Sequence, residues 1–137
     1  MKIKKKNGTL LLVILAISIC YALTYIPHKI VTIMPAEVAT IKIFDGNTGK
    51  SLIINDRKNI EHIIGNLNTI KFRKGRLSSR YKGYSFNTTI YKINGEVYKQ
   101  FIINSVGSIR KDPFFYIDSK NSIDYDYIRK LISYNNN

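Results

Sequence analysis

The longest stretch without a charge is "TLLLVILAISICYALTYI", from Thr9 to Ile26, which follows the lysine-rich start "MKIKKKNG". As a helix it would span about 27 Å, close to the hydrocarbon thickness of a bilayer. Tyr21 and Tyr25 lie near its far end, where rings with a polar group favour the headgroup layer. Lysines ahead of a first apolar segment tend to stay in the cytoplasm. The pattern predicts a single-pass transmembrane signal-anchor helix, with the rest of the chain extracytoplasmic.

Two other fates of this segment stay open beside the anchor. Cleavage as a signal peptide needs small residues at alternate positions, and "CYA" at 20–22 is a poor version of that pattern. Lipidation at Cys20 needs a small residue before the cysteine, where this chain has Ile19. Cys20 is the only cysteine of the chain, so the part beyond residue 26 can form no internal disulfide.

The chain of 137 residues has room for one domain and an appendage. Pro27 and Pro35 frame a mostly apolar stretch, which indicates a short extended neck. The predicted segments are a basic cytoplasmic tail at 1–8, the transmembrane anchor at 9–26, the neck at 27–36, an extracytoplasmic domain at 37–134 and a tail at 135–137.

The stretch "DGNTGKS" at 45–51 ends like a phosphate-binding loop but lacks the first glycine of that loop. The pattern GxxxxGK[ST] needs a glycine five positions before Gly49, and Phe44 stands there. A calcium loop of the EF-hand type is excluded too, because Lys50 stands where that loop needs glycine. Short runs of branched apolar residues flank the stretch, as in strands. It therefore predicts a β-hairpin turn rather than a nucleotide or calcium site.

Two amphipathic helices are predicted in the domain. The first begins after Asp56 or Asn55 as N-cap and carries an apolar stripe with a spacing of three and four, namely Ile60, Ile63, Ile64 and Leu67. The second begins after Ser122 as N-cap. Asp124 and Asp126 lie in its first turn and cations near its end, which suits the helix dipole.

The remaining segments predict an antiparallel sheet. The runs "YSFNTTIYKI" and "EVYKQFIIN" are joined by Asn94-Gly95, the strongest short-range hairpin signal. A short further strand is expected at 106–110, and "DPFFY" is interpreted as a turn whose Phe114 and Phe115 fill the core. The order β-β-α-β-β-(β)-α then predicts a two-layer α+β fold, an antiparallel sheet of about 4–6 strands with two helices packed on one face.

Three stretches together resemble small membrane-anchored proteins of unknown function from low-GC Gram-positive bacteria of Bacillus or Clostridium type. They are "IKIFDGNTGKSLIINDRKNIEHIIGNLNTIKFRKG", "GYSFNTTIYKINGE" and "DPFFYIDSKNSIDYDYIRKL". The resemblance covers roughly residues 37–131. It implies a location and a domain, but no reaction and no functional residue.

Residues that carry catalysis are sparse. Of the two histidines, His28 lies in the neck and His62 is expected on the solvated face of a helix, and neither has an obvious nucleophile beside it. The chain shows no Cys/His cluster that would predict a metal site. Asp112 and Asp118, on either side of the aromatic turn, are the remaining candidates for acid/base work. We predict no catalytic, cofactor or metal site, and an enzyme of unknown class is the last of the alternatives.

Charge is the feature that points to a partner. Beyond residue 26 lie eighteen of the 22 Lys and Arg and all nine acids, which leaves a net charge of +9 that attracts polyanions. The stretch "KFRKGRLSSRYK" concentrates this charge in six cations without an acid: Lys71, Arg73, Lys74, Arg76, Arg80 and Lys82. These six are the predicted anion-contact patch, on a loop, and a plain solvated loop is the alternative.

Two functions from different classes follow. The first is a binding module at the outer membrane face, held in the bilayer by residues 9–26, which contacts anionic lipid or an anionic wall polymer through the basic loop. The second is an immunity-type or accessory protein that binds a protein partner. Nucleic acid is not expected, because the domain is predicted to lie outside the cell.

Overall fold

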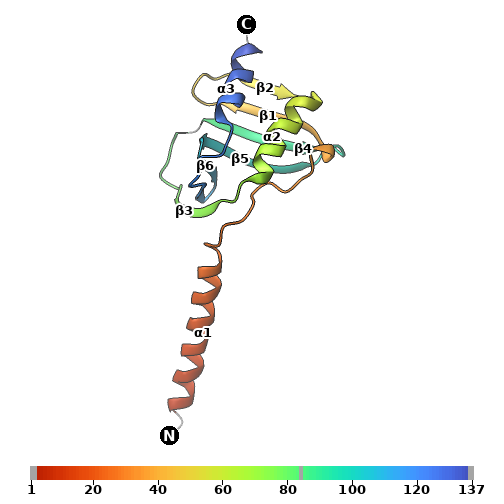
Figure 1. Cartoon of the computed structure of the whole chain (residues 1–137). Coiled ribbons are helices and arrows are strands. Elements are labelled where there is room, and N and C mark those ends of the chain that lie inside the picture. The colour runs from red at the N-terminus through yellow and green to blue at the C-terminus, as the bar shows by residue number, and fades with distance from the viewer. Residues whose placement is uncertain (1–2, 84, 136–137) are drawn as a thin grey trace.

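The computed structural model describes residues 3–83 and 85–135, and Figure 1 shows the whole chain. Residues 1–2 and 136–137 of the predicted tails, and Tyr84 at the start of a predicted strand, lie outside this description. The first helix, α1 (Ile3–Leu23), extends away from a domain that contains all the strands (Figure 1).

The helix α1 ends at Leu23, three residues before the end of the apolar run that the sequence predicts to be helical. The N–H groups of Thr24, Tyr25 and Ile26 bond to carbonyls three residues back instead of four, so the α-helix ends at Leu23. Residues 9–23 span about 22 Å, against about 30 Å for the hydrocarbon core of a bilayer. Within the described residues, no helix combines the length and the apolar character that crossing a membrane requires. This finding contradicts the predicted transmembrane helix, the signal-anchor and the single-pass location.

One antiparallel sheet of seven strands forms the domain, where the sequence predicts four to six. Its spatial order is β2-β1-β4-β5-β6-β7-β3, so the chain passes from one edge strand, β2, to the other, β3, through α2. The strands are β1 (Val38–Asp45), β2 (Ser51–Ile54), β3 (Arg73–Leu77), β4 (Phe86–Lys92), β5 (Val97–Ser105), β6 (Ser108–Lys111) and β7 (Phe114–Ile117).

The two helices of the domain lie on one face of the sheet (Figure 1). Asp56 caps α2 (Arg57–Thr69) as predicted, because its carboxylate accepts the N–H of Asn59 at 3.0 Å. Asp124, rather than the predicted Ser122, caps α3 (Tyr125–Tyr134) by accepting the N–H of Tyr127 at 3.3 Å.

Branched aliphatic and phenylalanine side chains fill the space between sheet and helices. The predicted stripe of α2 is buried throughout, and alternate residues of β1, β2, β4 and β5 face it. The most deeply buried members are Ile41, Ile43, Ile60, Ile64, Leu67, Phe72, Phe86, Ile90, Ile103 and Ile109. This face therefore carries the main core.

The two predicted hairpins are confirmed, with one glycine in each turn at positive φ. In the β1–β2 turn Asp45 accepts the N–H of Asn47 at 2.9 Å and the hydroxyl of Thr48 at 2.8 Å, and Gly49 has φ 72°. The β4–β5 turn places Gly95 at φ 85°. Both turns need a residue that enters the left-handed region without steric strain.

Two segments that the sequence analysis assigned to loops are strands. The basic stretch contains β3, and β7 begins within the aromatic "DPFFY" and runs to Ile117; the two strands pair with each other at one edge of the sheet. Phe115 is buried, but it lies outside the main core cluster, while Phe114 is only partly buried. The predicted core-filling turn is therefore a strand between β6 and the edge strand β3, with a phenylalanine on each face.

The predicted neck packs into the domain instead of lying apart from it. Ile30, Val31 and Ile33 are members of the main core. His28 forms a bridge with Phe72 through two backbone hydrogen bonds of 3.0 and 2.8 Å. The segment after α1 is thus fixed beside the start of β3.

Candidate polyanion-binding surface

The predicted basic patch begins at the edge of the sheet. Phe72 is fully buried, and its backbone is paired with His28. Because side chains alternate along an extended chain, Lys71 and Arg73 on either side of Phe72 point away from the core, and both are exposed. The pairing of Phe72 thus directs these two cations into solvent.

A β-bulge sends the next two cations to opposite faces. The pairing of β3 with β7 shifts register between Lys74 and Leu77. The Nζ of Lys74 lies 3.9 Å from the centroid of the Phe114 ring, and the guanidinium carbon of Arg76 lies 5.3 Å from that of Phe115. Phe114 and Phe115 are successive residues of a strand and face opposite ways, so the two cations do too.

Lys74 lies among aromatic rings at the end of α1. Its Nζ is 5.2 Å from the centroid of Tyr21 and 5.4 Å from that of Tyr25, besides its contact with Phe114. It also donates a hydrogen bond of 3.4 Å to the hydroxyl of Thr24. Cation–π attraction therefore draws this charge toward the connection between α1 and the sheet.

Arg76 belongs to a second small cluster, which we call the Phe115 cluster: Phe115, Tyr81, Arg76 and Arg110. The rings of Tyr81 and Phe115 meet edge to face at 5.2 Å, and the guanidinium carbon of Arg110 lies 5.9 Å from the Tyr81 centroid. Arg110 also donates to the carbonyls of Tyr81 and Gly83, at 3.1 and 3.2 Å. The cluster fixes the loop after β3 against β6 and β7.

Arg80 and Lys82 are exposed on that loop. Within the described residues their side chains take part in no hydrogen bond or ion pair. They are available to a ligand, but they lie beyond the bulge and the Phe115 cluster. The six predicted cations therefore form no single loop surface, which corrects the sequence prediction. Lys71 and Arg73 flank Phe72 where β3 starts, Lys74 and Arg76 contact aromatic rings, and Arg80 and Lys82 follow in the loop.

Two adjoining hollows, of about 130 and 460 Å³, open beside the start of β3. Lys71 and Ser119 line both of them. Arg73 lines the smaller hollow and Lys120 the larger. Arg73 is paired with Ile117 across the two strands, so the register places Lys71 opposite Ser119. The structure thereby brings a cation from the β7–α3 connection, Lys120, to the two that begin β3.

Sequence reasoning missed Lys120 and Ser119. Only the pairing of β7 with β3 could have indicated them. The sequence did not predict this pairing, because both segments were interpreted as loops. Lys120 lies in a turn with few cations around it along the chain, so charge clustering does not single it out. A strand assignment for "FFYI" would have placed the residues after it beside the basic stretch.

Asp118 lies in the wall of the larger hollow and is 5% exposed. Burial alone would raise its pKa, but hydrogen bonds from the amides of Ser122 and Lys120, at 2.7 and 3.0 Å, hold the pKa of this carboxyl below its usual value. The carboxylate is therefore ionised at neutral pH and fixed as part of the turn.

Asp112 contacts a different open hollow, lined also by Arg110. The hydroxyl of Ser78 donates to its carboxylate, and Arg110 lies beside it at 3.0 Å, so the pKa of Asp112 is lowered from its usual value. Asp112 and Asp118 do not line one closed pocket, which was the arrangement that would have favoured acid/base chemistry.

His62 is not the purely solvated residue that the sequence predicts. Its Nε2 lies 2.7 Å from the carboxylate of Asp124, and its ring stacks on Tyr127 at 3.7 Å between centroids. The hydroxyl of Tyr127 in turn donates to Asn59. These contacts join α2 to α3 on the outside of the helical layer, which is a structural role.

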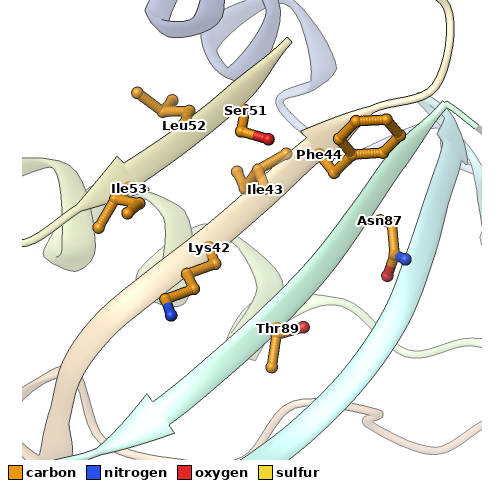
Figure 2. A pocket seen from close by; sticks show the side chains of 8 residues that line it. All are labelled: Lys42, Ile43, Phe44, Ser51, Leu52, Ile53, Asn87 and Thr89. Atoms are coloured by element: carbon orange, nitrogen blue, oxygen red, sulfur yellow. The ribbon is translucent and has the colours of Figure 1, made fainter. Parts of the chain in front are cut away.

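A further hollow of about 300 Å³ lies on the sheet at β1, β2 and β4. Figure 2 shows Lys42, Thr89 and Asn87 around it together with Phe44 and Ile53. It is open and mixes one cation with apolar and amide groups. In the described part of the chain, no three His, Cys, Asp or Glu side chains gather as metal ligands.

No family model, curated protein or solved structure matches this chain. The resemblance drawn from the sequence stays a prediction.

Proposed function

We propose that this protein is a binding module for an anionic polymer, which it contacts through the cations at the start of β3. The observation that carries the proposal is the orientation of Lys71 and Arg73. Both point away from the buried Phe72, both are exposed, and within the described residues neither side chain is used in a hydrogen bond or ion pair.

The charge of the whole chain supports the same proposal. The formal net charge is +13, so a polyanion is attracted from a distance before it makes any contact. Arg80 and Lys82 extend the exposed charge along the loop that follows the strand. Each cation that reaches a strongly anionic surface contributes about 1 kcal/mol, so a few suffice for a salt-sensitive complex.

The test is binding of fluorescent inorganic polyphosphate to the full chain, measured by anisotropy from low to high salt. The double variant K71Q/R73Q should weaken binding about 25-fold at low salt, since two contacts of about 1 kcal/mol are lost. The wild-type affinity should fall steeply as salt rises, because exposed charges are screened.

The matched control is K58Q/K130Q, which removes the same charge from exposed positions on α2 and α3. It should weaken binding by no more than about twofold, through the general field alone. Equal effects of the two double variants would contradict a defined surface. Vesicles of anionic lipid, tested in parallel, distinguish a polymer from a headgroup: a larger loss on vesicles than on polyphosphate would contradict the polymer.

A protein partner is the second candidate, favoured by the exposed apolar side chains on the outside of β1 and β2. Ile53 is 59% exposed beside the hollow of Figure 2. The variant Ile53→Ser separates the two candidates, because it should leave polyphosphate binding unchanged. A loss of polyphosphate affinity in this variant would show that the polymer binds near β2 and would contradict the proposed surface at the start of β3.

A further inference from the structure

We propose that Lys71, Arg73 and Lys120, together with the hydroxyl of Ser119, form one binding site for a phosphate group. This site, called here the Lys120 site, extends the proposed function and rests on it. It names the chemical group of the polymer that is bound and adds two residues from outside the basic stretch.

The geometry brings the four side chains around adjoining hollows. Ser119 and Lys71 border both hollows, Arg73 closes the smaller and Lys120 the larger. All four residues are exposed, and within the described residues none of the four side chains has a hydrogen-bond partner. The donor groups of these side chains therefore face solvent and can bind an acceptor in the hollow.

The donor set suits phosphate. The guanidinium of Arg73 offers a planar pair of N–H groups that fits two oxygens of a phosphate, and the two ammonium groups add charges that rotate freely. The Ser119 hydroxyl can donate to a further oxygen. A single carboxylate offers two oxygens and one negative charge, whereas a phosphate monoester offers three terminal oxygens and up to two charges.

The local charge agrees with this choice. Three cations and the ionised Asp118 give the site a net charge of +2. This matches one phosphate monoester or two consecutive phosphodiester units. Asp118 competes for the cations less than an unbonded carboxylate would, because its oxygens already accept hydrogen bonds from the amides of Lys120 and Ser122.

The backbone around the site is fixed before any ligand binds. On one side Phe72 is paired with His28. On the other side the turn at 118–122 is tied down, since the N–H of Asp118 bonds to Gly107 at 2.8 Å and Asn66 donates to the carbonyl of Ser122 at 2.9 Å. A fixed turn loses little conformational freedom on binding, which favours affinity.

The experiment is calorimetric titration of the full chain with sodium tripolyphosphate at low salt. K120Q should weaken binding about fivefold, and S119A by about threefold to tenfold, the range of an ordinary solvent-exposed hydrogen bond. The matched control K130Q removes the same charge from the exposed side of α3 and should change affinity by less than about twofold. Unchanged unfolding midpoints verify that each variant is folded.

A second arm replaces tripolyphosphate by the tricarboxylate tricarballylate at equal ionic strength, which should bind at least about fivefold more weakly. Equal affinities for the two anions, or equal effects of K120Q and K130Q, would overturn the Lys120 site. If K71Q/R73Q still weakens polyphosphate binding in that case, the proposed function stands without this site. If the wild type binds neither anion nor polymer, the proposed function itself fails.

Discussion

The region of β1, β2, β4 and β5 and the edge formed by β7 and β3 are stabilised by different contacts. In the first, branched aliphatic side chains and Phe86 pack against the stripe of α2 and against α3. In the second, the charged groups of two basic side chains lie over aromatic rings: Lys74 over Phe114, and Arg76 over Phe115. The first region buries apolar surface between two layers, while the second covers single rings at the margin of the sheet.

This difference in packing also affects which region presents charge to solvent. At the edge, Lys74 and Arg76 contact aromatic rings through their charged groups, while Lys71 and Arg73 on either side of the buried Phe72 present charge to solvent. Stability and a binding surface can thus come from the same strand.

The largest expected effect is in the first region. Phe86→Ala should lower the free energy of unfolding by about 3–5 kcal/mol, because the ring is 1% exposed and packs on Tyr125 at 4.6 Å between centroids. Urea denaturation followed by circular dichroism measures it. Ile53→Ala, at a 59% exposed position, is the control and should lose less than about 1 kcal/mol. Similar losses in both variants would contradict a single main core.

A smaller effect is expected in the Phe115 cluster. Phe115→Ala should lower the free energy of unfolding by about 2 kcal/mol, the transfer contribution of one ring, because the loop over it can close part of the space left. The same denaturation experiment applies. A loss as large as that of Phe86→Ala would show that the two clusters act as one core, and the comparison would fail.

The pH dependence of stability tests the contacts of Asp112 with Ser78 and with Arg110 of the Phe115 cluster. Asp112 has a lowered pKa in the folded state, so its contribution is present above about pH 4 and is lost as pH falls through the folded-state value. Asp112→Asn should therefore lower the free energy of unfolding at pH 7 by no more than about 1 kcal/mol, since the group is largely exposed.

The measurement compares wild type and Asp112→Asn at pH 7 and at pH 2.5. The difference between the two free energies of unfolding should narrow at the lower pH, because the Asp112 carboxylate loses its charge as pH falls through its lowered pKa. A difference of the same size at both values would mean that the ionised carboxylate contributes nothing specific to the cluster.

The smallest effect concerns Lys74 and the end of α1. Lys74→Gln should change the overall free energy of unfolding by about 0.5 kcal/mol, as expected for a cation over exposed rings. Hydrogen exchange of the amides at 21–28 should rise more than that of the β4 amides, because the contact is local. Uniform acceleration across the chain would show that Lys74 supports the whole domain.

The two regions also differ in how far their structure could be predicted from the sequence. The stripe of α2, the cap at Asp56 and the hairpin turns with Gly49 and Gly95 all follow from local rules, and the structure confirms them. Each depends on spacing within one element or on the conformational demand of one turn. Such features need no knowledge of distant partners.

Strands β3 and β7 could not be predicted in this way. β3 carries cations and Gly75 where a strand signal needs branched or aromatic side chains, and Pro113 beside Phe114 suggests a turn. Both strands exist because they pair with each other across some forty residues, and because rings cover the basic stems. The apolar length of α1 was also overestimated, since the turn at 24–26 is not visible in hydropathy.

The placement of arginines along β3 also affects how copies of this protein behave at high concentration. An edge strand exposes N–H and C=O groups that a second sheet can extend, which is a common start of aggregation. Two molecules approaching along β3 would bring Arg73 and Arg76 of each into proximity, and like charges repel. This repulsion therefore discourages edge-to-edge pairing of two sheets, and a bound polyanion would neutralise it.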